Sequence, residues 1–429
     1  MNRSEANPRT TLAILLGLCL AQTAAIAGFD PPIWDPNMPR WDTSPWEDRL
    51  AANRYRQEGA EVVPWSQEIG LPSPGNAAIL YYQAFLLRPQ PDDATALQIN
   101  AVLKGGLPDD VIRTYLGRCR QMIHTVEIAS QSPHCEWAIR YLDTNGFSLA
   151  ALAGEVRQLA FVLSLDARTL GVDGHSEAAF ARCLTIRRLA RHVGRDTLIA
   201  YLVALGIDSV ACQAMQYVLS CTPPDADLLL NVRGRLAALP DMSQSFRQAA
   251  QADLNLMLEY VKNDKTMIEY LREQWAETAE SQPAKDDALH LTDEEVLATA
   301  KESSERVLNS VFQVMDSEMP YDQKYAEIDR RMIDASRRPG MLVGVTTQMW
   351  NLGVRDQAGY NALKTALEIH LILAQTGQLP EALPAYCPKD PYSGRDFEYE
   401  VTDTGFVLRC RAMDISDNKA WQYEFSVRK

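Results

Sequence analysis

The stretch PKDPYSGRDFEYEVTDTGFVLRC, from Pro388 to Cys410, decides the predicted fold of the C-terminal part of the chain. Apolar and polar residues alternate in it and in the later segment WQYEFSV, and this period of two is typical of strands with one buried face. The residues expected on that face are Phe397, Tyr399, Val401, Phe406, Leu408, Cys410, Trp421, Tyr423, Phe425 and Val427. We therefore predict three antiparallel strands, with Val401 opposite Phe406 across a turn at residues 402–405.

A three-stranded sheet needs a partner that covers its apolar face. The preceding segment NALKTALEIHLILAQTG offers an apolar stripe that is suited to this role, and we predict a helical stretch at residues 341–376. The stripe consists of Leu363, Ala366, Leu367 and His370. We interpret His370 as a core residue.

The dipeptide Asp390-Pro391 predicts a turn before the first strand, since Asp and Pro are favoured at its first two corners. Gly394 can then take a left-handed backbone conformation. The carboxylates in this stretch are interpreted as turn and solvent-face residues, not as an acid and base pair. They are Asp390, Asp396, Glu398 and Glu400.

Most of the remaining chain has the pattern of helices that are separated by short turns. Asn76 and Asp109 can cap helices, and Thr292 begins a capping box with Glu295. The predicted fold class is mainly α, with antiparallel helical hairpins and a small C-terminal α+β module. The predicted parts are a signal peptide at 1–27, a Pro/Trp-rich extended arm at 28–75, a helical body at 76–340 and a helix with the three-stranded sheet at 341–429.

The first residues have the pattern of an export signal. Arg3 and Arg9 precede the apolar run TLAILLGLCLAQTAAIAG, which ends in the small residues of Ala25-Ile26-Ala27. We predict cleavage after Ala27, and the alternative is an uncleaved membrane anchor. The predicted location is therefore exported, which includes the periplasm, the envelope and the medium.

The arm at 28–75 carries eight prolines and four of the eight tryptophans of the chain, Trp34, Trp41, Trp46 and Trp65. Prolines disfavour helix and strand interiors. We interpret the tryptophans as anchors that hold an extended arm on the body, since large aromatic side chains contribute strongly to burial. The alternative is a surface that binds sugars or peptides.

The charge and the cysteines limit the partners and the compartment. The formal net charge is -14, and an acidic protein repels phosphate backbones, so no nucleic-acid partner is predicted. Seven cysteines follow the signal peptide, and an oxidising compartment favours pairing of some of them. We predict a disulfide between Cys387 and Cys410. The pairing of the other five cysteines is left open. Proximity in sequence suggests Cys119 with Cys135 and Cys212 with Cys221, and Cys183 would then remain unpaired.

A family resemblance rests on the order of motifs near the C-terminus. A helix is followed by Gly377-x-Leu379-Pro380-Glu381-x-Leu383, then by Asp390-Pro391-x-Ser393-Gly394, then by aromatic strands. This order resembles the C-terminal half of the major pseudopilins of type II secretion. Most of the mature chain, including Cys135-Glu136-Trp137, is similar to uncharacterised exported bacterial proteins that join a helical body to such a tail. The N-terminus lacks a prepilin cleavage site, so the resemblance implies no assembly into a pseudopilus.

The resemblance also implies candidate calcium ligands, because pseudopilins of this type often bind calcium near the loop before the last strand. The corresponding loop here is MDISDNKAW, and its hard oxygen ligands are Asp414, Asp417 and Asn418. The loop lacks the glycine and the spacing of an EF-hand, so the alternative interpretation is a polar turn.

No motif identifies an activity. The six histidines form no two-histidine metal motif, and the chain has no G-x-S-x-G, P-loop or G-x-G-x-x-G sequence. No catalytic residue and no cofactor other than calcium are predicted. The basic run from Arg187 to Arg195 is interpreted as charge at a helix end, or alternatively as an anion or partner site. The predicted function is a non-catalytic binding or structural component of the cell envelope with a protein partner, and the alternative is a secreted or periplasmic hydrolase with dispersed catalytic residues.

Overall fold

The computed structural model describes residues 75–137, 147–279, 281–338, 342 and 344–427. The predicted signal peptide and all but the last residue of the predicted arm lie outside these residues. The chain divides into two compact units, whose described parts are residues 75–137 and the residues from 147 onward. This division falls inside the predicted helical body at 76–340.

The described part of the smaller unit contains three helices whose starts are set by capping side chains. Asn76, Asp92 and Asp109 each accept a hydrogen bond from a backbone N–H in the first turn, as is typical of N-caps. The helices are α4 (Ala77–Leu87), α5 (Asp93–Leu103) and α6 (Asp110–Ser130). Trp137 closes the unit, because it is 2% exposed and its ring stacks on Tyr81 with 5.3 Å between ring centroids.

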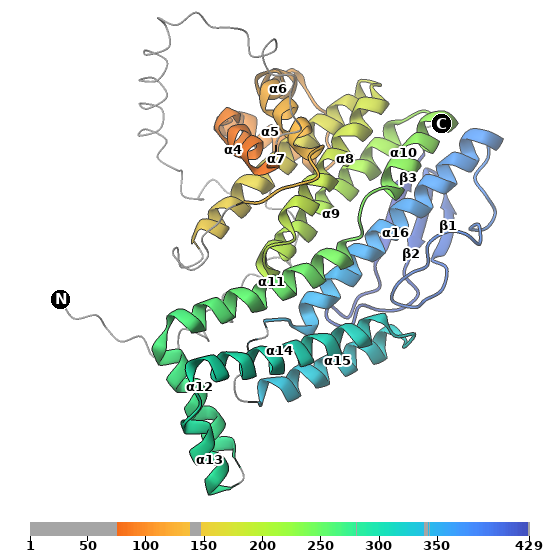
Figure 1. Cartoon of the computed structure of the whole chain (residues 1–429). Helices are drawn as coiled ribbons and strands as arrows, with labels where there is room; N and C mark the ends of the chain where they lie inside the picture. Colours follow the sequence, from red (N-terminus) through yellow and green to blue (C-terminus); the bar gives the residue numbers. More distant parts are fainter. Residues whose placement is uncertain (1–74, 138–146, 280, 339–341, 343, 428–429) are drawn as a thin grey trace, which may run out of the picture. The chain divides into compact units, whose positions relative to one another are not determined.

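The described part of the larger unit contains helices that pack as neighbours. Its helices are α7 (Phe147–Val172), α8 (Ser176–Val193), α9 (Leu198–Cys221), α10 (Ala226–Ala237), α11 (Met242–Asn263), α12 (Lys265–Thr278), α13 (Gln282–Leu289), α14 (Asp293–Asp316), α15 (Tyr321–Ser336) and α16 (Thr347–Thr376). Helix α8 packs against α7 and α9, and α14 packs against α11 and α15. The long α16 runs beside α9, α10 and α11 (Figure 1), and it connects the helices to the sheet.

Among the described helices, α9 is the one that is long and apolar enough to cross a membrane. Of its most apolar stretch, 67% is buried inside the protein, as in the core helix of a folded domain. Its position explains this burial, since α9 contacts α7, α8, α11, α16 and β3.

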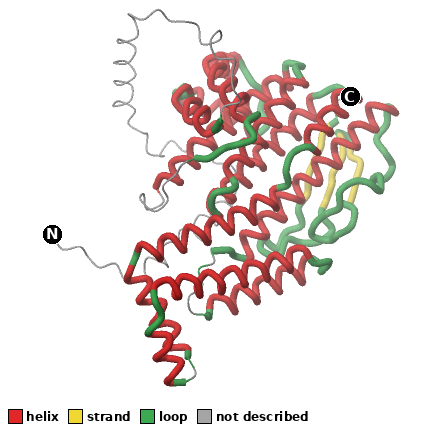
Figure 2. Tube along the Cα trace, in the orientation of Figure 1, coloured by secondary structure: helices red, strands yellow, loops and turns green. Residues whose placement is uncertain are grey.

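The three strands form one antiparallel sheet in the order β1-β2-β3, which Figure 2 shows as a single group beside the helices. The strands are β1 (Glu398–Thr402), β2 (Gly405–Arg409) and β3 (Gln422–Ser426). The predicted mainly α fold with this small sheet is confirmed, and so is the register with Val401 opposite Phe406. One side chain departs from the prediction, because Val401 lies at the strand end and is 52% exposed.

The apolar face of the sheet is covered by α16 and by α9. His370 of α16 is buried, and its ring lies 5.7 Å from that of Phe406. Gln216 of α9 donates a hydrogen bond to the carbonyl of Glu424, so α9 also holds the outer edge of β3. The predicted apolar stripe of α16 therefore faces the sheet, as expected. Helix α9 is a second helix that covers the sheet, and the sequence pattern did not indicate it.

The turn at Asp390 is present, but its aspartate lies inside the protein. Gly394 has the expected positive φ of 69°. The Asp390 side chain is fully buried, and its carboxylate accepts hydrogen bonds from the Tyr392 N–H at 3.0 Å, the Ser393 hydroxyl at 2.6 Å and the Arg411 N–H at 2.9 Å. This carboxylate therefore ties the turn to the end of β2, and Asp390 is the turn residue that the sequence predicted, although its burial was not expected.

Candidate functional site

The loop from Arg411 to Ala420 connects β2 to β3 and contains the predicted calcium ligands. Asp414 and Lys419 form an isolated bridge, in which the Asp414 N–H donates to the Lys419 carbonyl at 2.9 Å. Asn418 has a φ of 50°, a left-handed conformation that asparagine tolerates better than most residues. The loop therefore turns tightly on its own backbone, and Asp414 is fully buried while its neighbours Met413 and Ile415 are exposed.

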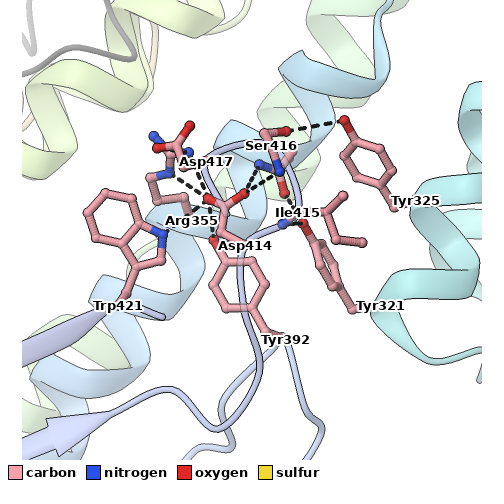
Figure 3. Close-up of polar contacts among 10 residues, drawn as sticks. Tyr321, Tyr325, Arg355, Tyr392, Asp414, Ile415, Ser416, Asp417 and Trp421 are labelled. Carbon is pink, nitrogen blue, oxygen red and sulfur yellow. Dashed lines mark hydrogen bonds and ion pairs between the residues drawn. The ribbon is translucent and has the colours of Figure 1, made fainter. Parts of the chain in front are cut away.

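The carboxylate of Asp414 is the centre of a dense hydrogen-bond network (Figure 3). Its Oδ1 accepts from Asn351 Nδ2 at 2.7 Å and from the Ser416 N–H at 3.0 Å. Its Oδ2 accepts from Arg355 Nε at 3.0 Å, Arg355 Nη2 at 2.7 Å, Trp421 Nε1 at 3.1 Å and the Tyr392 hydroxyl at 3.2 Å. These donors come from α16, the Asp390 turn, the loop itself and the residue before β3, so one carboxylate joins four separate segments.

A second layer holds the donors in place. The buried Tyr321 at the start of α15 donates its hydroxyl proton to Asn351 Oδ1 at 2.5 Å and accepts from the Ile415 N–H at 3.1 Å. Tyr325, one turn further along α15, lies within 3.2 Å of the Ser416 hydroxyl. Since Asn351 can donate to Asp414 only with its amide oriented in this way, Tyr321 fixes the direction of that bond.

The electrostatics of the loop favour an ionised Asp414. Burial alone raises its pKa, but the hydrogen bonds from Asn351, Trp421 and Arg355 outweigh burial and hold the pKa below the usual value. The guanidinium of Arg355 also lies 4.7 Å from the centre of the Trp421 ring, a cation–π distance. A carboxylate with this many donors is a structural centre, because it has little remaining capacity to accept a proton or a ligand.

The predicted calcium ligands are brought together, but around a protein cation. Arg355 Nη2 lies 2.7 Å from Oδ2 of Asp414 and 2.7 Å from Oδ2 of Asp417. Asn418 contributes its backbone conformation to the turn. Among the described residues, no group of three or more His, Cys, Asp or Glu side chains is arranged to hold a metal. The calcium site stays a prediction, and in this structure the positive charge between the two carboxylates belongs to Arg355.

The network leaves two apolar side chains on the outside of a fixed loop. Met413 is 55% exposed and Ile415 is 43% exposed, and they flank the buried Asp414 in sequence. Ile415 begins the turn that the bridge between Asp414 and Lys419 closes, and Met413 directly precedes this bridge. A loop that is held in this way and displays two apolar side chains can bind a complementary surface.

The predicted disulfide between Cys387 and Cys410 is not present in the structure. Both residues are buried as separate thiols. The Cys410 thiol interacts with the Asp390 carboxylate, which helps to raise its pKa. Burial raises the pKa of Cys387 to about 11 and also raises that of Cys410, so neither is an activated thiol.

Two arginines of the basic run on α8, Arg187 and Arg191, belong to a buried ionic cluster. Arg187 and Asp208 are both fully buried, with Arg187 Nη2 2.8 Å from Asp208 Oδ2. Arg191 Nη1 lies 2.6 Å from Asp208 Oδ1, and the ring of Tyr360 lies 3.8 Å from the Arg187 guanidinium carbon. Arg191 and His192 do lie in the last turn of α8, as expected for charge at a helix end. The sequence pattern did not indicate that Arg187 and Arg191 pair with Asp208 of α9 inside the protein.

Two further places in the larger unit carry groups of chemical interest, Asp356 on α16 and a pocket beside α8. Burial and the neighbouring Asp208 raise the pKa of Asp356 on α16 well above the usual value for aspartate. A shallow pocket of about 470 Å³ lies at the starts of α8 and α10, but its lining contains no histidine or cysteine. Asp225 in that pocket accepts from the Leu228 N–H at 3.1 Å as the N-cap of α10. The two hydroxyls that line the pocket, those of Ser176 and Thr222, form a hydrogen bond with each other at 3.2 Å.

Comparisons of the chain with protein-family models, with curated proteins and with solved structures each gave no match. The resemblance to pseudopilins therefore rests on the motifs near the C-terminus and stays a proposal. Sequence reasoning found Asp414 and Asp417 but missed Asn351, Arg355 and Tyr321, which hold them. The available signal was the four-residue spacing of Asn351 and Arg355, which places both on one face of the predicted helix.

Proposed function

We propose that this protein is an exported, non-catalytic binding or structural component of the cell envelope that contacts a protein partner through the loop at residues 411–420. The observation that carries the proposal is the buried Asp414, which anchors the loop while Met413 and Ile415 are exposed on either side of it. The chemistry that fits this surface is an apolar depression on another protein.

The anchoring supports binding for an energetic reason. A loop that is already ordered loses little conformational freedom when it meets a partner, so more of the contact energy remains as affinity. The methionine adds adaptability, because its unbranched side chain fills irregular apolar spaces. In addition, the charged groups beneath the loop are already paired with one another, and a partner does not have to neutralise them.

The resemblance to a pseudopilin-like tail and the N-terminal signal pattern support the location. We propose that residues 1–27 are removed during export and that the mature protein begins at Gly28. The intact mass of the protein recovered from its native host tests this part. A chain that still begins at Met1 contradicts cleavage.

The binding proposal is tested with a photo-reactive amino acid placed at position 413 or 415 in producing cells. We expect a specific cross-linked protein from both positions, and no such product when the same group replaces Asp403 in the turn between β1 and β2. Combining the label with Asp414→Asn should reduce cross-linking, since the loop loses its anchor. Equal products from positions 403 and 413, or none from 413 and 415, contradict the proposal.

A second candidate function, a secreted or periplasmic hydrolase, is favoured by the buried carboxyl of Asp356. An aspartate with a raised pKa beside a second carboxylate is a typical position for a general acid. Turnover in a broad hydrolase screen that Asp356→Asn abolishes, with folding intact, would favour the enzyme over the binding protein.

A further inference from the structure

Helix α4 is apolar on both of its faces. Its sequence AAILYYQAFLL has one amide and no charged residue, and its inner face buries Ala77, Ala78, Tyr81 and Ala84. On the outer face Ile79 is 60% exposed and Leu86 is 62% exposed, and these two residues, seven positions apart, lie on the same line along the helix. A helix that is apolar all round is normally buried all round, so this face is suited to a covering segment.

We propose that residues 62–74, the last part of the Pro/Trp-rich arm, dock on the outer face of α4. This segment, VVPWSQEIGLPSP, ends directly before Gly75 and the N-cap Asn76. It carries apolar side chains at Val62, Val63, Trp65, Ile69 and Leu71, and prolines at 64, 72 and 74. The prolines favour an extended backbone and lack N–H groups that would have to be satisfied against an apolar helix.

The lengths of the two segments match. Leu86 lies about 16 Å along α4 from Gly75 at the rise of about 1.5 Å per residue of an α-helix. Leu71 and Ile69 precede Gly75 by up to about 13 and 20 Å of extended chain at about 3.3 Å per residue. A chain that turns back at Gly75 therefore brings Ile69 and Leu71 alongside the stretch between Ile79 and Leu86.

Because the segment is covalently joined to α4, it occupies this face more readily than a separate molecule with the same contacts would. A segment joined to its binding surface through a short connection has an effective concentration in the millimolar range, so even a weak apolar contact is populated. Other occupants of the same face, such as the larger unit of this chain, a second copy or another protein, are distinguished by the experiment.

The test measures the accessibility of position 86 in the full mature chain. Leu86→Cys is labelled with a maleimide, and the labelling rate at this residue is read by peptide mapping. Leu97→Cys on α5 is the reference, because Leu97 is also strongly exposed, at 72%. We expect Cys at position 86 to react at least tenfold more slowly than Cys at position 97.

An arm variant then identifies the occupant. Ile69→Asp with Leu71→Asp should raise the labelling rate at position 86 about tenfold, whereas Ser66→Asp with Gln67→Asp, which adds the same charge at polar positions, should leave it slow. Far-UV circular dichroism confirms that each variant keeps its helices. Fast labelling of position 86 in the unmodified arm overturns the proposal, and so does protection that persists in the Ile69 and Leu71 variant.

Discussion

Arg355 Nη2 lies 2.7 Å from Oδ2 of Asp414, and this pair connects the middle of α16 to the loop before the last strand. Asp414 is fully buried and the Arg355 side chain is 16% exposed, so the pair is largely removed from water. Such a pair is stable only when further hydrogen bonds satisfy both groups. Here Asn351, Trp421 and Tyr392 donate to Asp414, and Arg355 also pairs with Asp417 at 2.7 Å.

Asp414→Asn should destabilise the protein by about 2–4 kcal/mol, because it leaves a mostly buried guanidinium with one carboxylate partner fewer. The measurement is the free energy of unfolding from denaturant titration at neutral pH. Asp403→Asn is the matched control, since it makes the same change at an exposed turn residue and should alter stability by less than about 0.5 kcal/mol. A loss at position 414 no larger than at position 403 contradicts the anchoring role.

Calcium and Arg355 should compete for the same two carboxylates. We expect millimolar calcium to leave the melting temperature of the wild-type protein unchanged, because the guanidinium lies between Asp414 and Asp417. Arg355→Ala removes that charge and should give a melting temperature that rises with calcium, since weak extracellular sites fill at about 10⁻⁴–10⁻³ M. Magnesium is the control ion. A calcium-dependent rise in the wild-type protein that Asp417→Ala abolishes would instead support the calcium site predicted from the sequence.

Replacing Asp208 alone should destabilise the protein more than replacing it together with Arg187 and Arg191. Asp208→Leu leaves Arg187 and Arg191 charged and buried, and we expect a loss of about 3–5 kcal/mol in the free energy of unfolding. The triple variant Arg187→Met, Arg191→Met and Asp208→Leu removes all three charges and should lose less than the single one.

The control for this cluster is the exposed pair of Arg306 and Glu302, whose side chains are 65% and 75% exposed. Glu302→Leu should change stability by less than about 1 kcal/mol, because exposed ion pairs contribute little. If the triple variant is less stable than Asp208→Leu, the two arginines stabilise the fold through contacts other than their pairing with Asp208.

Asp253 on α11 should destabilise the folded protein as the pH rises. Burial raises its pKa to about 6, although the hydrogen bond from the Leu198 N–H lowers it. Because the folded state prefers the protonated acid, its stabilising effect is complete below about pH 4 and is lost between about pH 4 and 6. Asp253→Asn should therefore be more stable than the wild type at pH 7, by up to about 3 kcal/mol, and not at pH 4. Glu259→Gln, at an exposed position of the same helix, should show no such dependence, and a difference at position 253 that is constant with pH contradicts the assignment.

Local patterns in the sequence correctly predicted the helix caps and the strand register, because both depend on residues that are close together in the chain. Asn76 and Asp109 cap helices as expected, and the capping box of Thr292 and Glu295 is complete. The strand register followed from the period-two pattern, because a shift by one residue would have placed polar side chains in the core. The short α13 was missed, since its polar sequence has no apolar face and none of its residues is buried.

Contacts between distant segments could not be predicted in this way. Tyr321 and Asn351 are 30 residues apart, and Asn351 and Asp414 are 63 residues apart, so no spacing rule connects them. The same applies to Arg187, whose charge suggested a surface until its pairing with Asp208 on the next helix was known. For Asp390, turn chemistry predicted the backbone correctly but contained no information about burial.

His370 should make the protein less stable in acid, which is opposite to the effect of Asp253. It is 5% exposed, its Nε2 has no hydrogen-bond partner among the described residues, and burial lowers its pKa to about 4. Between about pH 6.5 and 4 the unfolded chain takes up a proton at this histidine and the folded protein does not, so folding stability falls as the pH falls, by up to about 3 kcal/mol. His370→Leu removes this proton uptake and keeps an apolar side chain against Phe406. The stability of the variant relative to the wild type should therefore increase from pH 7 to pH 4.5, as measured by denaturant titration at each pH. His290→Leu, at an exposed position, should show no such increase. If the stability of His370→Leu changes with pH in parallel with that of the wild type over this range, the result contradicts a buried neutral histidine at position 370.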